Sequence, residues 1–240
     1  MKKVINRFLC IPLFLMGFLS LGQTEDYKIW EEKTNLGYQF FQQNNFREAK
    51  IYFEEALEYS IKASDSMPWA DINTKYFYGA TLYKLNSFLK ASNYFEESLN
   101  QAEKLPERDV DFEILLQTEI ASIYSTLGDN KTAISKQNKL NSFIKEVKGE
   151  KTAVYAGSLT TLGQMYFSVG NCEEAINHYN KAKSIFLDLR LRTMDVATVY
   201  NNLGLCYFGA GDYDKALECL NQLLNLPKTT EREDIQSLAR

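Results

Sequence analysis

Histidine, proline and glycine are scarce in this sequence, and basic residues are not in excess. The 240 residues include 1 histidine, 4 prolines and 12 glycines, and 27 basic residues stand against 31 acidic ones. A single imidazole excludes a multi-histidine metal site, and the slightly acidic balance lacks the basic face that nucleic acids usually require. The hydrophobic fraction of 45% and the charged fraction of 24% are typical of a globular protein. We therefore expect a folded chain that binds no nucleic acid.

Catalytic motifs are also missing. The sequence has no CxxC pair and no glycine-rich phosphate loop, and no serine or cysteine has a histidine partner in the spacing of a nucleophile motif. We interpret His178 as a partly exposed helix residue. Glutamate pairs such as Glu54-Glu55 and Glu96-Glu97 recur at corresponding points, and solvated helix faces explain them better than acid–base chemistry. We predict no enzyme activity, no cofactor, no metal site and no small-molecule substrate.

The first 22 residues differ from the rest of the chain. Three basic residues come first: Lys2, Lys3 and Arg7. The segment from Phe8 to Leu21 is apolar apart from Ser20, and small residues at Ser20 and Gly22 suit cleavage by a signal peptidase. The alternative is a membrane anchor, but the apolar run of about 14 residues is shorter than the roughly 20 that a spanning helix needs. We predict a signal peptide at residues 1–22 and an exported protein in the periplasm or cell envelope.

Three cysteines follow this segment, and an odd number leaves at least one free thiol or an intermolecular bridge. Cys206 and Cys219 fall in segments expected to be helical, where the usual role is that of a small buried hydrophobic residue. Cys172 falls in an expected turn, where the thiol could be exposed.

A pattern of small and large residues recurs about every 42 residues and determines the fold class. Each copy has a small residue at the same place: Gly37, Gly79, Ala121, Gly163 and Gly204. Twelve residues later each copy has an alanine, at Ala49, Ala91, Ala133, Ala175 and Ala216. Sixteen residues after the small residue come Phe53, Phe95, Gln137, Tyr179 and Leu220. The small residues allow two helix backbones to approach closely, and the large ones fill the space around that contact.

Turn residues separate the two helices of each copy. Asparagine or glycine, which accept the left-handed conformation that ends a helix, occur at Asn44, Asn86, Gly128, Gly170 and Gly211. Asp129, Asn171 and Asp212 follow directly and are suited to cap the next helix. Each copy is therefore predicted to be a helix–turn–helix unit.

This pattern resembles the tetratricopeptide repeat family over about residues 27–226. The family's spaced signature is present as Leu162-Gly163, Tyr166, Ala175, Tyr179 and Ala182, and again as Leu36-Gly37, Phe40, Ala49, Phe53 and Ala56. The copies are longer than the common repeat of about 34 residues and are similar to the kinesin light chain type, whose Asn-Asn-Leu-Gly string stands at Asn201 to Gly204. The resemblance implies an all-α fold, a right-handed α-solenoid of about five helix–turn–helix hairpins. The repeats are expected at about residues 27–67, 69–105, 109–148, 152–190 and 193–226.

The third repeat and the end of the chain depart from this regularity. Ala121 replaces the glycine, Gln137 the aromatic residue and Leu140 the last small residue, which puts regular packing in doubt and allows a local bend or a looser joint. We interpret residues 227–240 as a linker and the start of a further or capping helix. They are either a frayed terminal helix or a sign that the sequence is part of a longer protein.

The resemblance also implies a groove, because in this family the first helices line a concave face that holds the ligand. The corresponding positions are Thr34, Tyr38, Phe41, Tyr76, Tyr83, Thr118, Ser122, Thr160, Gln164, Phe167, Asn201 and Phe208. These positions carry hydroxyl, amide and aromatic groups and lack the lysines with which some members bind a terminal carboxylate. They suit an extended or helical peptide held by backbone contacts and apolar anchors. Some of the aromatic residues, Phe41 and Phe167 above all, could instead only seal one repeat against the next.

We predict an exported interaction scaffold that binds a protein or peptide in this groove. The alternative is a sensory or regulatory module whose C-terminal domain, a kinase, a DNA-binding domain or a protease, belongs to a longer protein. A membrane span soon after Arg240 in the full gene would favour that alternative, whereas a stop codon or one capping helix would favour the scaffold.

Overall fold

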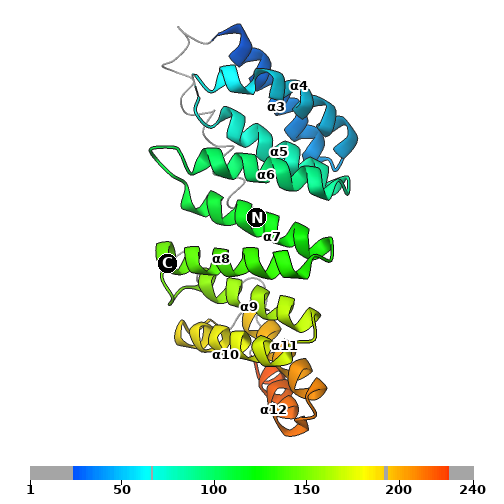
Figure 1. Cartoon of the computed structure of the whole chain (residues 1–240), viewed down its shortest axis with the longest axis vertical. Helices are drawn as coiled ribbons and strands as arrows, with labels where there is room; N and C mark the ends of the chain where they lie inside the picture. Colours follow the sequence, from blue (N-terminus) through cyan, green and yellow to red (C-terminus); the bar gives the residue numbers. More distant parts are fainter. Residues whose placement is uncertain (1–23, 66, 192–193, 227–240) are drawn as a thin grey trace. The chain divides into compact units, whose positions relative to one another are not determined.

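The computed structural model describes residues 24–65, 67–191 and 194–226, and these residues form ten α-helices and no β-strand (Figure 1). The helices are α3 (Glu25–Gln42), α4 (Phe46–Ala63), α5 (Ala70–Lys84), α6 (Phe88–Ala102), α7 (Val110–Thr126), α8 (Asn130–Lys148), α9 (Ala153–Ser168), α10 (Cys172–Asp188), α11 (Met194–Gly209) and α12 (Tyr213–Leu224). The expected all-α fold, with about five helix–turn–helix copies, is confirmed.

The helices belong to two compact units, the first ending at Leu127 and the second beginning at Gly128. In the first unit α3 packs on α4, α4 on α5, α5 on α6 and α6 on α7; in the second, α8 packs on α9, α9 on α10, α10 on α11 and α11 on α12. Each unit has a hydrophobic core of its own. The division falls in the third repeat, the copy that departs most from the sequence pattern.

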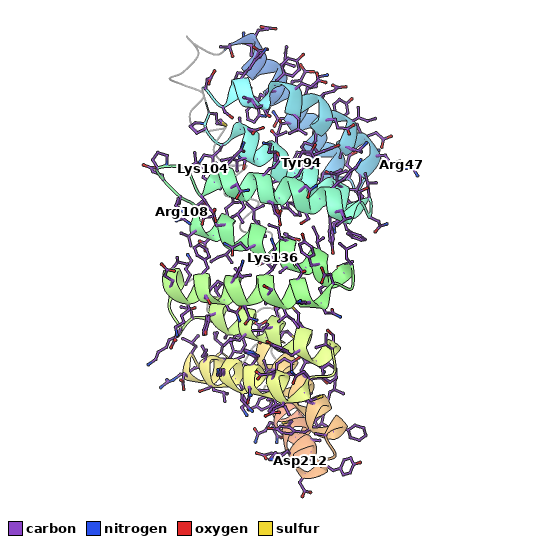
Figure 2. All side chains as sticks on the ribbon, viewed as in Figure 1. Arg47, Tyr94, Lys104, Arg108, Lys136 and Asp212 are labelled. Carbon is purple, nitrogen blue, oxygen red and sulfur yellow. The ribbon has the colours of Figure 1, made fainter. Side chains whose placement is uncertain are left out.

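In every repeat the turn between the two helices contains a residue with a left-handed backbone at the equivalent position. Five residues have the expected left-handed backbone, at Asn44 (φ 59°), Asn86 (φ 59°), Gly128 (φ 76°), Gly170 (φ 79°) and Gly211 (φ 80°). In the last three repeats the next side chain caps the second helix. Asp129, Asn171 and Asp212 each accept a hydrogen bond from the backbone N–H three residues further on, and Figure 2 labels Asp212 at the start of α12. Both predictions are confirmed.

A glycine on the first helix makes room for a ring on the second helix. Three repeats share this contact: Gly37 with Phe53, Gly79 with Phe95, and Gly163 with Tyr179. A Cβ atom on Gly163 would lie 2.6 Å from Cε1 of Tyr179, closer than real Cβ contacts. Since the three rings are fully buried, these positions exclude any side chain larger than hydrogen without rearrangement.

The fifth repeat does not share this tight contact. A Cβ atom on Gly204 would lie 3.6 Å from Cβ of Cys219, which is ordinary van der Waals contact. Leu220 occupies the position of the ring in this repeat. The sequence pattern treats Gly204 as equivalent to the other glycines, whereas the structure leaves room for a methyl group there.

Hydrogen bonds replace the aromatic packing at Gln137. This side chain is 1% exposed, and its Nε2 donates to Oγ of Ser158 at 2.8 Å and to Oδ1 of Asn141 at 3.2 Å. The Ser158 hydroxyl donates to the same Asn141 oxygen. These contacts join α8 to α9 within the second unit, so the substitution that put regular packing in doubt is accommodated by a buried polar cluster.

A second buried polar cluster surrounds Asp71 in the first unit. Its carboxylate accepts hydrogen bonds from the Ser60 hydroxyl, from Nε2 of Gln101 at 2.7 Å and from the ammonium of Lys75 at 2.9 Å. Burial alone raises the pKa of Asp71, but these donors outweigh burial and hold the pKa below its usual value. The donors come from α4, α5 and α6, so the cluster ties three helices together.

Two expectations concern residues outside the described part of the chain: the signal peptide at residues 1–22 and the terminal segment 227–240. Of the helices that the described ranges contain, none has the length and apolar character needed to cross a bilayer.

Candidate functional site

Seven of the twelve residues expected to face a ligand lie on the first helices of the first unit, α3, α5 and α7. We call them the unit-1 face: Thr34, Tyr38, Phe41, Tyr76, Tyr83, Thr118 and Ser122. The ring of Tyr38 lies 5.4 Å from that of Phe77 on α5, and the ring of Tyr76 lies 5.4 Å from that of Phe112 on α7. Both tyrosines remain partly exposed. They therefore connect one repeat to the next while part of each side chain remains accessible.

Aromatic residues four positions after the small residue pack edge-on against the start of the second helix. This contact recurs three times, between Phe41 and Phe46, Tyr83 and Phe88, and Phe208 and Tyr213, with ring centroids 5.3–5.6 Å apart. The sequence interpretation missed the partner ring, whose signal is an aromatic residue nine positions after the small residue in three repeats. The ring pairs fix the orientation of these side chains on the unit-1 face and on α11.

The hydroxyl groups of the unit-1 face differ in their partners. The Tyr38 hydroxyl accepts a hydrogen bond from Nε2 of Gln42 at 2.6 Å, and exposed Thr118 donates to the carbonyl of Ile114 at 2.7 Å. The Thr34 hydroxyl is buried and has no hydrogen-bond partner. Ser122 is half-buried. The face therefore combines apolar rings with hydroxyl groups that retain hydrogen-bonding capacity.

A carboxylate that the sequence interpretation missed lies beside these residues. Glu119 directly follows Thr118 on α7, is half-buried, and forms no hydrogen bond or salt bridge with the described residues. Burial raises the pKa of Glu119, and the charge of Lys84 opposes this only in part. Burial, together with the nearby Glu119 charge, also raises the pKa of Tyr76. Glu119 could have been found in the sequence as an acidic residue next to the ligand-facing position Thr118.

The other five residues lie on α9 and α11 of the second unit, and we call them the unit-2 face: Thr160, Gln164, Phe167, Asn201 and Phe208. Gln164 and Asn201 are exposed, and the rings of Phe167 and Phe208 are 39% and 64% exposed. Thr160 is only 8% exposed, and its hydroxyl donates to the carbonyl of Ala156 at 3.0 Å. Thr160 therefore offers a ligand the least surface of the five.

The groups with catalytic potential are placed elsewhere. His178 on α10 stacks on Tyr166 with centroids 5.4 Å apart, and burial lowers its pKa, so the imidazole is neutral at pH 7. Cys206 and Cys219 are buried as expected, and burial raises the pKa of the Cys206 thiol to about 12. Cys172 is the first residue of α10, directly after the expected turn, and it is half-buried, so its thiol is partly exposed. In the ranges described, no three histidine, cysteine or acidic side chains gather as a metal site would require.

Comparisons with known proteins agree with this architecture. Residues 33–60 and 154–229 match the tetratricopeptide repeat family. No curated protein matches the chain.

Several solved structures share the fold. BtubC (BKLC) from P. vanneervenii has a TM-score of 0.70 and 20% identity, with 84% of this chain and 80% of that chain covered. Nearly identical TPR-like repeats of a putative kinesin light chain from Podosopora anserina have a TM-score of 0.68 and 17% identity, covering 88% of this chain and 100% of that chain. MamA from Desulfovibrio magneticus RS-1 has a TM-score of 0.62 and 14% identity, covering 88% and 99%.

The repeat pattern, the helix pairs and the family matches lead to one assignment. The chain contains tetratricopeptide repeats, matched at residues 33–60 and 154–229, and its fold is similar to that of the kinesin light chain repeats and is one suited to protein–protein interaction.

Proposed function

We propose that this protein is an exported scaffold that binds a peptide or protein partner on the faces of its first helices. The observation that carries the proposal is the row of accessible aromatic and amide side chains on these helices. Phe208 is 64% exposed, Phe167 is 39% exposed and Gln164 beside it is exposed. Apolar anchors with polar groups between them suit an extended or helical peptide.

Export is the second part of the proposal. The positively charged start, the short apolar segment and the small residues at Ser20 and Gly22 support it. Partner binding would then take place in the periplasm or at the cell envelope. The scaffold acts by presenting a preformed surface and carries out no reaction itself.

Peptide selection with the purified chain tests the binding proposal. Peptides retained from a random displayed library are synthesised, and their dissociation constants are measured by fluorescence anisotropy. Two variants probe the two faces, Tyr38→Ala on α3 and Gln164→Ala on α9. Two matched variants, Ile51→Ala on α4 and Leu187→Ala on α10, change side chains that are 52% and 44% exposed on second helices.

A selected peptide binds one of the two units. The proposal predicts that the face variant of that unit, Tyr38→Ala or Gln164→Ala, weakens binding of the peptide about tenfold, as loss of an interface anchor does. The second-helix variants should leave the dissociation constant within about twofold, in the range of a peripheral contact. Thermal unfolding confirms that each variant is folded, and Gln164 suits this control because its side chain is exposed. If both face variants retain every selected peptide, the first-helix faces are not the binding surface.

A further inference from the structure

Helix α12, the last helix labelled in Figure 1, presents a row of large apolar side chains to solvent. The row consists of Tyr213, Leu217, Leu220 and Leu224, and we call it the α12 seam. These side chains are 64%, 60%, 43% and 79% exposed. Their spacing of four, three and four residues places them along one side of the helix and is the spacing with which two helices pair in a coiled coil.

The earlier repeats bury the corresponding side of their second helices. At the position of Leu220 they have residues that are at most 1% exposed: Phe53, Phe95, Gln137 and Tyr179. The first helix of the next repeat contributes to this burial. The ring of Phe53 stacks on that of Phe77 on α5 with centroids 5.9 Å apart, and Gln137 donates a hydrogen bond to Ser158 on α9. The α12 seam is therefore a helix-packing surface, and none of the described helices packs on it.

The composition of the seam suits an identical helix. Among the five second helices, α12 alone has leucine at all three of these positions, whereas α10 has Ile176, Tyr179 and Lys183 there. Leucine side chains of equal size can interdigitate across a pair of helices. The residue that borders the middle of the seam, Asn221, is uncharged. A second copy of α12 would therefore meet complementary apolar side chains and no like charge at the centre.

The area of the seam is also sufficient. The exposed fractions of its four side chains correspond to roughly 450 Å² of accessible surface in each chain, a large apolar patch for a monomer. The ring of Phe208 extends this patch, because it contacts the Tyr213 ring with centroids 5.6 Å apart. Two such surfaces and their polar margins would bury about 1,000 Å² or slightly more in total, which is the lower limit for a specific interface.

We propose that two copies of the chain form a dimer through their α12 seams, with the two helices antiparallel around a two-fold axis near Leu220. Leu217 of one copy then faces Leu224 of the other, and the two helix dipoles oppose each other favourably. A two-fold contact of this kind closes on itself and ends at a dimer. The dimer carries two copies of each first-helix face, so a partner with two matching segments would bind it more tightly than it binds one chain.

Sedimentation velocity of the purified chain tests this proposal. The sedimentation coefficient should rise between about 1 and about 100 µM, the range in which an interface of this modest size associates. Two double variants test the arrangement. Leu217→Lys with Leu224→Lys places like charges opposite each other in the antiparallel pair, whereas Leu217→Lys with Leu224→Glu places opposite charges there. The control is Ile51→Lys, which adds the same charge at a 52% exposed position on α4.

We expect the control to dimerise like the native chain. The variant with two lysines should weaken the dimer by roughly a hundredfold, and the lysine–glutamate variant should recover most of this loss. The melting temperature of each variant confirms that it is folded, since the changed side chains are exposed.

Three results would overturn the proposal. A native chain that stays monomeric at about 100 µM would do so, and would leave residues 227–240 or a different protein as the occupant of the seam. Equal dimerisation of the native chain and the variant with two lysines would place the contact elsewhere. Equal weakening by both double variants would exclude the antiparallel arrangement. Since the assay uses no peptide, none of these results decides the scaffold proposal.

Discussion

Two glycines on α9 should respond in opposite ways to alanine. Nothing lies within 4 Å of a Cβ atom built on Gly157, whereas a Cβ atom on Gly163 would lie 2.6 Å from the Tyr179 ring. Alanine favours a helix over glycine by about 1 kcal/mol, so Gly157→Ala should raise the free energy of unfolding by about that amount. At Gly163 this gain is opposed by overpacking of about 1–3 kcal/mol. The Tyr179 ring is fully buried and cannot move aside freely, so we expect the overpacking to outweigh the gain, with a net loss of up to about 2 kcal/mol.

Urea unfolding followed by far-ultraviolet circular dichroism measures these differences as shifts of the midpoint under identical conditions. Gly204→Ala provides a third point, because its Cβ atom would meet only ordinary van der Waals contacts. We expect Gly204→Ala to behave like Gly157→Ala. If Gly163→Ala were at least as stable as the native chain, the account of close helix packing around this glycine would be wrong.

Three further predictions concern acid stability, thiol reactivity and export. Because folding lowers the pKa of Asp71, the stabilisation from its cluster is present above the usual aspartate pKa and is lost as the pH falls through the folded value. Asp71→Asn should therefore lower the free energy of unfolding by about 2 kcal/mol at neutral pH and make the melting temperature fall less steeply with decreasing pH. An unchanged dependence of the melting temperature on pH would contradict this. Alkylation of the native protein, followed by peptide mass spectrometry, should modify half-buried Cys172 before buried Cys206. The raised pKa of the Cys206 thiol leaves little reactive thiolate. Equal alkylation rates for the two cysteines would contradict this difference in burial. The mass of the protein recovered from expressing cells should lack residues 1–22, and a mass that retains them would exclude the predicted cleavage.

The sequence predicted those features that each repeat specifies locally. The positions of Asn44 and Gly170 could be identified as turns because few residue types tolerate a left-handed backbone. The contact between Gly163 and Tyr179 followed from a recurring pairing of small and large residues. These features depend on short-range geometry that is copied from repeat to repeat, so self-similarity was a sufficient guide.

Features that depend on particular neighbours could not be predicted in this way. Gln137 was expected to weaken its repeat, but its buried hydrogen bonds require Ser158, 21 residues away, a pairing that no column of the pattern reveals. Glu119 was missed because its partial burial on α7, which raises the pKa of its carboxyl group, is not visible in a single sequence. The family resemblance placed Thr160 among the ligand-facing positions, yet the packed structure leaves it only 8% exposed.

Hydrogen–deuterium exchange with and without a selected peptide tests the central claim, that the first helices form the binding surface, most directly. For a peptide that binds the first unit, the account predicts slower exchange of backbone amides on α3, α5 and α7, with little change on α4 and α6. For a peptide that binds the second unit, it predicts slower exchange on α9 and α11, with little change on α10 and α12. Protection confined to these second helices would contradict it.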